Sequence, residues 1–217
     1  MVRVALFPLH TVLFPGMALP LHIFEPRYRK MAHACLSEET PFGVVLIRAG
    51  REVGGPAVPY NIGTLARIRH VEHLPDGRMH IEAVGEERFR LVQLFAAQDE
   101  VHTGSITEFP LAGADQPAAH VATRALSPWL TRYLELLAEA ASTHFSENPL
   151  PPDPAGLAYL AAIVAQIPMS EKQALLSVAN AADLLRIERT LYRRETSLLR
   201  AMLASHPHHS TQRYCSN

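Results

Sequence analysis

The segment from Leu6 to Tyr28 constrains the fold more than any other part of the chain. It holds two Phe-Pro pairs, Phe7-Pro8 and Phe14-Pro15, on either side of a short apolar run. Proline fixes φ and has no backbone N–H, so Pro8 is expected to end a first strand. A glycine and a second apolar run follow, and Pro26 suits the first position of a helix. The segment therefore predicts strand, turn, strand and helix start in close succession.

The rest of the first half is typical of short strands, because apolar runs alternate with turn-forming residues. One helix is expected from Pro26 to about Leu36, with Tyr28, Met31, Ala32 and Cys35 on its buried face. The expected strands are Arg3–Phe7, Ala18–Phe24, Phe42–Ile47, Gly63–Val71, Met79–Val84, Arg88–Phe95 and Val101–Phe109. Six or seven short strands, one helix and regular turns predict a small closed or partly closed barrel.

The composition changes after a segment, 110–117, that resembles a linker in its Pro and Gly content. Beyond it the chain is rich in Ala and Leu at helical spacing. We expect a helix over 118–143, a second opened by Asp153-Pro154, a short third started by a capping box at Ser170, and a long fourth over 181–204. The buried stripe of the last is predicted to be Leu184, Leu191, Leu198 and Met202. This organisation predicts two subdomains, 1–112 and 117–205, and a disordered tail, 206–217.

The composition is that of a soluble globular protein, with 48% hydrophobic and 19% charged residues among 217. A net charge of −1 gives no global attraction to nucleic acid or to an anionic membrane. No apolar run is long enough to span a membrane, and the N-terminus lacks the apolar core of a signal peptide. Two cysteines in unlike surroundings favour a reducing compartment, so the expected location is the cytoplasm.

Several segments, taken in order, resemble the LON substrate-binding domain, which is the N-terminal domain of Lon ATP-dependent proteases. They are LFPLHTVLFPG at 6–16, GTLARI at 63–68, LPDGR at 74–78, EERFRL at 86–91 and EKQALL at 171–176. The resemblance extends from about Arg3 to Met202 and is closest to stand-alone members of the family. It implies an α+β fold, with an N-terminal PUA-like β-barrel followed by a C-terminal helical bundle. It also implies binding of unfolded or apolar polypeptide segments and a role as an adaptor in protein turnover.

Catalysis is not expected. The proteases of this family continue into an ATPase domain and a Ser-Lys peptidase domain, and this sequence contains no GxxxxGK[ST] phosphate-binding motif. Its only lysines are Lys30 and Lys172, and helix capping accounts for the nearby Ser170. His70 and His73 lie three apart on an expected strand and so point to opposite faces, which disfavours a metal site. We therefore expect a non-enzymatic protein without metal or cofactor.

Two groups of residues in the opening segment are candidates for binding. Apolar side chains could line a groove for polypeptide or simply fill the core, and both alternatives remain open. They are Phe14, Met17, Phe24, Tyr28 and Met31. Glu25 and Arg27 form a polar cluster at the helix start with Tyr28, which either attaches the helix to the barrel or contacts a partner.

A third candidate is a basic patch, because Arg67, Arg69, Arg88 and Arg90 occupy alternate strand positions, with Arg88 and Arg90 expected to face outward. PUA-like barrels bind RNA in other families, so an RNA-binding module is the alternative function. Pairing with neighbouring glutamates would cancel such a patch, and the chain lacks surplus lysines. The expected partners are polypeptide substrates or a separate protease or chaperone, with nucleic acid disfavoured, no membrane, and the oligomeric state left open.

Overall fold

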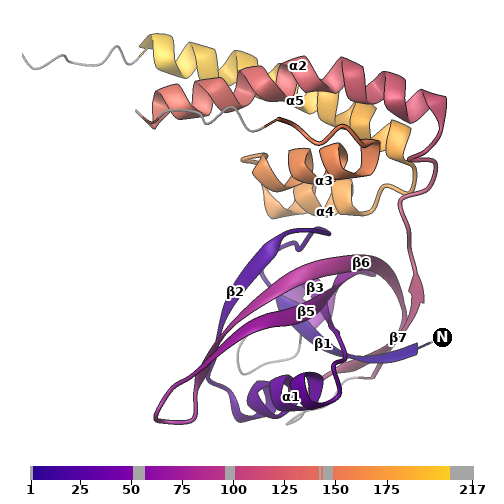
Figure 1. The fold of residues 1–217 in the computed structure, drawn as a ribbon, viewed down its shortest axis with the longest axis vertical. Helices are drawn as coiled ribbons and strands as arrows, with labels where there is room; N and C mark the ends of the chain where they lie inside the picture. Colours follow the sequence, from indigo (N-terminus) through magenta and orange to yellow (C-terminus); the bar gives the residue numbers. More distant parts are fainter. Residues whose placement is uncertain (1, 51–56, 96–100, 142, 144–148, 206–217) are drawn as a thin grey trace, which may run out of the picture.

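The structure is a computed structural model that describes residues 2–50, 57–95, 101–141, 143 and 149–205. Strands form one half of the molecule and four helices form the other, with one further helix against the strands (Figure 1). The strands are β1 (Val2–Leu9), β2 (Ala18–Ile23), β3 (Phe42–Gly50), β4 (Ala57–Pro59), β5 (Ile62–His73), β6 (Met79–Phe95) and β7 (Thr103–Glu108). The helices are α1 (Pro26–Ser37), α2 (Pro117–Ala140), α3 (Pro154–Val164), α4 (Met169–Leu176) and α5 (Ala181–Ser205). None of the described helices is long and apolar enough to cross a membrane.

The seven strands form one mostly antiparallel sheet in the order β1-β7-β6-β5-β3-β4, and β2 pairs with β6. The first half of β1, Val2 to Ala5, pairs with β7. Its second half, Leu6 to Leu9, pairs in parallel with β3. The pairings therefore run in a closed circuit through β1, β7, β6, β5 and β3. The two ends of β1 have different neighbours, which is important for the cavity described below.

The opening segment contributes residues to each of the three apolar clusters formed by the described residues. Phe7, Leu9 and Tyr28 belong to a cluster between α1 and the sheet. Leu6 faces the opposite way, into a small cluster with Phe89 and Ile106. Residues 12 and 14 join a third cluster with the helical half. Because successive side chains of a strand point to opposite faces, one short segment can connect three separate packing regions.

Gly85 allows the turn at Pro15 and Gly16 to lie directly on β6. A Cβ at Gly85 would stand 2.3 Å from the carbonyl oxygen of Phe14, which no side chain tolerates. The two chains are joined there by backbone hydrogen bonds from Gly16 N–H to the Gly85 oxygen and from Gly85 N–H to the Met17 oxygen, at 2.8 and 3.0 Å. The position of the turn thus depends on the absence of a side chain on β6.

The helices begin where the sequence offers a cap or a proline. Pro26 occupies the first turn of α1, and the buried residues of this helix are the predicted four, Tyr28, Met31, Ala32 and Cys35. Asp153 caps α3 by accepting a hydrogen bond from Gly156 N–H at 2.6 Å. Asn180 accepts one from Ala182 N–H at 2.9 Å at the start of α5. These short polar side chains satisfy donors that have no partner inside the helix.

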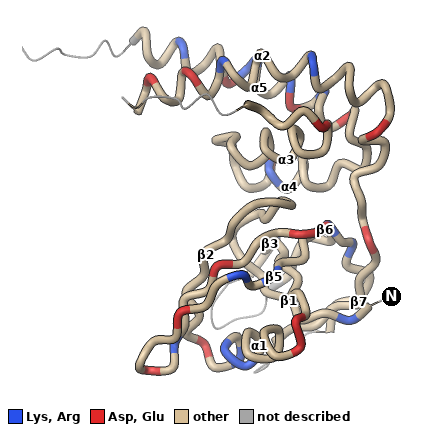
Figure 2. Tube along the Cα trace, viewed as in Figure 1, with Lys and Arg blue, Asp and Glu red and all other residues tan. Residues whose placement is uncertain are grey.

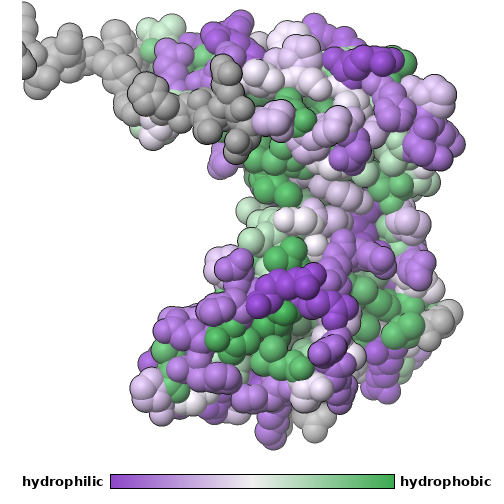
Figure 3. Space-filling model, viewed as in Figure 1, coloured by the Kyte–Doolittle hydropathy of each residue, from purple (hydrophilic) through white to green (hydrophobic). Residues whose placement is uncertain are grey.

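The two halves meet through α4, which lies next to the strands (Figure 1). The side-chain amide of Gln173 on α4 donates to the Ile62 carbonyl at 3.0 Å. Ala112, after β7, forms a bridge with Asn180, before α5. On one side the outline is hollowed between the halves, and hydrophobic residues gather along the hollow (Figure 3).

Some local predictions are wrong. The strand expected to end at Ile47 continues to Gly50, and β4 at 57–59 is not among the expected strands. Ser170 does not cap α4, which begins one residue earlier, with Pro168 before it and no side-chain cap. Leu184 and Leu191 are buried as expected, whereas Leu198 and Met202 are 54% and 63% exposed. Beyond Tyr192 the covered side of α5 instead carries Thr196, which is 1% exposed, and Leu199, which packs against the main cluster. The predicted tail, 206–217, lies outside the described residues.

Candidate functional site

The five apolar candidates do not line one groove. Phe14 is fully buried in the cluster shared with the helical half. Tyr28 and Met31 are 4% and 5% exposed in the cluster under α1. Met17 is partly buried between these two clusters, and Phe24 is exposed. The five side chains project from α1 and from the segments on either side of β2, so they reach different clusters or solvent instead of lining one groove.

Glu25, Arg27 and Tyr28 lie in contact at the start of α1. Arg27 and Glu25 are joined by an ion pair of 2.9 Å. The guanidinium of Arg27 also stands over the ring of Tyr28, 4.6 Å from its centroid. Burial lowers the pKa of His102, and the positive charge of Arg27 lowers it further.

The four arginines do not form one basic patch. Arg67 and Arg69 both contact the same carboxylate, Glu86, at 2.7 and 3.1 Å. Arg90 is exposed and stacks on Phe109. Arg88 was expected to face outward, but it is only 2% exposed. The register of β6 turns Arg88 toward the helical half, and the alternative of an RNA-binding surface has no support in these positions.

Arg88 instead ties the two halves together. Its Nη1 donates to the carbonyl oxygens of Leu176 and Val178, both at 2.7 Å, just where α4 ends. These carbonyls have no partner within the helix, so a charged donor is well matched to them. The guanidinium is also 4.8 Å from the ring centroid of Phe109, and burial lowers its pKa. Arg88, which the sequence pattern placed in a surface patch, therefore forms a structural contact between the two halves.

A cavity of about 720 Å³ lies between α1 and the first half of β1. Its volume is within the usual range of ligand sites, roughly 300–1,000 Å³. The apolar part of its wall comes mainly from Val4, Met31, Leu65 and Ile106. Met31 is the one predicted groove residue that contributes to it. Polar residues border the cavity: Arg3, Arg27, Lys30, Glu38, Glu87 and Glu108.

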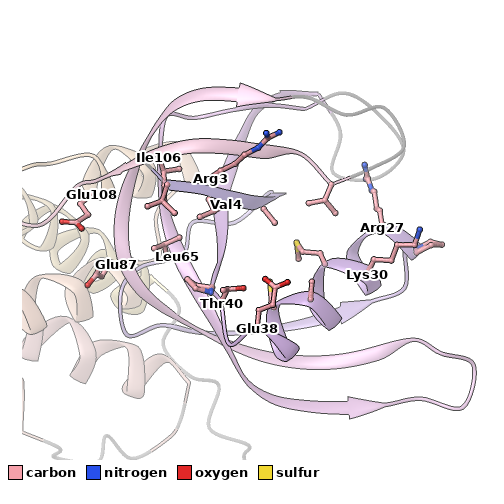
Figure 4. Close-up of a pocket in the computed structure, with 18 residues that line it drawn as sticks. Arg3, Val4, Arg27, Lys30, Glu38, Thr40, Leu65, Glu87, Ile106 and Glu108 are labelled. Atoms are coloured by element: carbon pink, nitrogen blue, oxygen red, sulfur yellow. The ribbon is translucent and has the colours of Figure 1, made fainter.

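Four of the six charged residues around the cavity are grouped by sign, and Arg3 and Glu38 lie between the two groups (Figure 4). Glu87 and Glu108 lie at one end, and Arg27 and Lys30 at the other (Figure 4). Glu108 pairs with the buried Phe89 across the β6–β7 ladder, and Glu87 is two residues from Phe89. Both carboxylates therefore stand on the face of the sheet that carries Phe89. Within the described residues, no side-chain hydrogen bond or ion pair engages Lys30, Glu87 or Glu108.

Glu25 at the N-cap of α1 has the charge that the helix dipole favours, but three other charged residues of the helix do not. Arg27 and Lys30 lie in its first turns, and Glu38 caps its other end. Figure 2 shows the basic and acidic residues at opposite ends of this helix. The helix dipole favours the reverse order, by about 0.3–1 kcal/mol for each charge. Their placement is thus better explained by what they face than by helix stability.

Sequence reasoning missed the cavity because its wall is assembled from five separate elements. One signal was available: Arg27, Lys30, Ala34 and Glu38 recur at helical spacing beside the predicted buried face. The carboxylates could not be assigned, since Glu87 and Glu108 are brought together only by the pairing of β6 with β7.

A comparison with known proteins now defines the family. The model of the ATP-dependent protease La (LON) substrate-binding domain matches residues 3–192. The chain belongs to the LON substrate-binding domain family. Lon protease 1 of Herpetosiphon aurantiacus is 23% identical over 181 residues, covering 81% of this chain and 22% of that protein. Lon protease 2 of Myxococcus xanthus is 27% identical over 201 residues, covering 88% of this chain and 23% of that protein.

Solved structures show the same LON fold. The Lon N-terminal domain protein from Xanthomonas campestris superposes with a TM-score of 0.64 at 23% identity, over 86% of this chain and 96% of that one. The N-terminal domain of the Mycobacterium avium complex Lon protease gives 0.62 at 17% identity, over 90% and 98%. The chain spans less than a quarter of the length of the two proteases named above. The matched region is the substrate-binding domain, which is not itself catalytic.

Proposed function

We propose that this LON domain binds polypeptide segments in the cavity between α1 and β1. The family supports a substrate-binding role. The observation that carries the proposal is the cavity itself, which joins an apolar wall to unpaired charges of both signs. Unfolded polypeptide offers the matching features, apolar side chains together with charged ones. The proposed binding site thus differs from the predicted N-terminal groove and shares only Met31 with it.

The remaining parts of the proposal concern organisation and context. We regard residues 1–112 as a PUA-like β-barrel subdomain and 117–205 as a helical bundle subdomain, which the closed circuit of strand pairings and the helical second half support. The domain acts without catalysis of its own, as an adaptor in the cytoplasm. It presents bound polypeptide to a separate protease or chaperone.

The experiment uses a variant that fills the cavity. Ala34 is exposed on α1 and lines the cavity, so Ala34→Trp places an indole in it without disturbing the buried face. The matched control is Ala140→Trp at the exposed end of α2. Binding of labelled unfolded peptides is measured by fluorescence anisotropy. We expect the wild type and Ala140→Trp to bind apolar-charged peptides, and Ala34→Trp to lose binding at least about tenfold. Equal affinities of the three proteins would refute this site.

A further inference from the structure

One edge of β1 is free along the cavity. Leu6 donates its N–H to His102 on the β7 side at 2.7 Å. Backbone groups alternate between the two edges of a strand, so those of Val4 also face β7, and those of Arg3 and the N–H of Ala5 face the opposite edge. On that edge β3 begins to pair only at Leu6 with Gly43. No strand of the described residues pairs with it beside Arg3.

The residues just before Phe42 explain why β3 begins no earlier in the chain. Pro41 directly precedes β3 and has no N–H to donate to a neighbouring strand. Two residues earlier Glu39 has a positive φ of 52°, which turns the chain away toward α1. Pro41 and Thr40 line the cavity beside Val2 to Ala5. The cavity therefore occupies the position that an extension of β3 would take.

The site has the dimensions and chemistry of an added strand. Val2 to Ala5 span roughly 13 Å at about 3.3 Å per residue, and along this length Arg3 and the N–H of Ala5 face the free edge. Alternate side chains of a guest strand would meet the apolar wall of Val4, Leu65 and Ile106. Main-chain hydrogen bonds to a free edge provide affinity in such complexes, and pockets for alternate side chains provide selectivity.

We propose that the cavity takes an extended polypeptide segment that pairs with the free edge of β1. A lysine or arginine of the segment lies against Glu87 and Glu108, and an acidic side chain lies against Lys30 and Arg27. The inference rests on the proposed function and specifies its substrate class: an alternating apolar segment with a basic residue and an acidic residue about four positions apart. Complementary charges at both ends of the cavity set the position of the segment along β1.

Charge exchange tests the contacts at each end. The probe is a labelled seven-residue peptide with Lys near one end, Glu near the other, and alternating Val and Thr between. We expect Lys30→Glu to weaken binding about fivefold, and replacement of the peptide Glu by Lys to restore it. We expect the same loss for Glu87→Lys with Glu108→Lys, restored by replacing the peptide Lys with Glu. Control variants Glu82→Lys and Arg200→Glu, at exposed positions away from the cavity, leave the affinity unchanged.

Backbone methylation tests the strand pairing. N-methyl groups on one alternate set of peptide residues would remove the donors that face β1, while the other set would point away. We expect one set to abolish binding and the other to preserve it within about twofold. If peptides bind and Ala34→Trp blocks them, but neither charge exchange nor methylation changes the affinity, the strand-addition model is overturned and the proposed function stands. If no peptide binds the wild type, both are overturned.

Discussion

Glu87 and Arg88 are neighbours on β6, yet their charges are used in opposite ways. Arg88 is 2% exposed and donates to two carbonyl oxygens of the helical half. Glu87 is exposed, lines the cavity and has no ion-pair or hydrogen-bond partner for its side chain within the described residues. The difference shows that strand alternation separates a charge that holds the two halves together from one that is free to meet a ligand. Stability and binding should therefore respond to different residues.

Replacing Arg88 should have the largest effect on stability. Arg88→Ala leaves the Leu176 and Val178 carbonyls without their charged donor in a buried junction, and we expect a loss of about 2–4 kcal/mol in the free energy of unfolding. Urea unfolding followed by circular dichroism measures it. Arg90→Ala, at an exposed position on the same strand, serves as the control and should change stability by less than about 0.5 kcal/mol. Equal effects of the two variants would contradict the assignment.

Glu188 extends the comparison to a buried carboxyl group. It is fully buried in the helical half, and neither carboxylate oxygen has a hydrogen-bond partner within the described residues. Burial raises its pKa well above the ordinary value. Glu188→Met should therefore stabilise the protein by roughly 1–3 kcal/mol near neutral pH.

The direction in which stability changes with pH tests the Glu188 prediction. The folded state retains the proton, while the unfolded chain releases it above its ordinary pKa of about 4.3. Stability of the wild type is therefore lost as the pH rises above that value, up to the raised pKa of the folded state. Thermal unfolding at pH 5 and pH 8 should show a larger gain for Glu188→Met at pH 8. A gain that shrinks as the pH rises would show that the carboxylate is charged and stabilised in the folded state.

Gln173 is a second, weaker connection between the halves. Gln173→Ala removes the donor to the Ile62 carbonyl, and the side chain is 2% exposed, so we expect a loss of about 1–2 kcal/mol. Gln166→Ala, at an exposed position before α4, is the matched control and should be nearly neutral. Chemical unfolding of both variants compares them directly. A neutral Gln173→Ala would mean that the junction depends on Arg88 and apolar packing alone.

The smallest effect on stability is expected at the cavity. Glu87→Ala and Lys30→Ala should each change the free energy of unfolding by less than about 0.5 kcal/mol, because both side chains are exposed and unpaired among the described residues. Peptide affinity, measured by anisotropy, should nevertheless fall several-fold. Glu82→Ala should alter neither quantity. If Glu87→Ala lowered the free energy of unfolding as much as Arg88→Ala, the two faces of β6 would not have the different roles assigned to them.

Several parts of the fold could be predicted because they depend on neighbours in sequence. The buried face of α1 follows from 3–4 residue spacing, and the polar cluster of Glu25 and Arg27 follows from proximity at a helix start. Other predictions failed because the outcome depended on residues outside the local pattern. Ser170 matches a capping box, yet Pro168 already starts the helix. Glu188 lies four residues from both Leu184 and Tyr192, in the buried stripe, and that spacing could have marked it as an interior carboxyl.

The sequence by itself determined most of the strands and helices and the membership in the LON substrate-binding family, since both are carried by local patterns and by motifs in linear order. It missed β4 and divided β6 into two strands. Tertiary structure alone decided what the charged residues do. It turned Arg88 inward because the register of β6 brings it under the end of α4. It gathered Glu87, Glu108 and Lys30 around one cavity because β6, β7 and α1, far apart along the chain, meet beside the free edge of β1. Alternation along a strand predicts that neighbouring side chains point to opposite faces, but only packing determines which face contacts a partner.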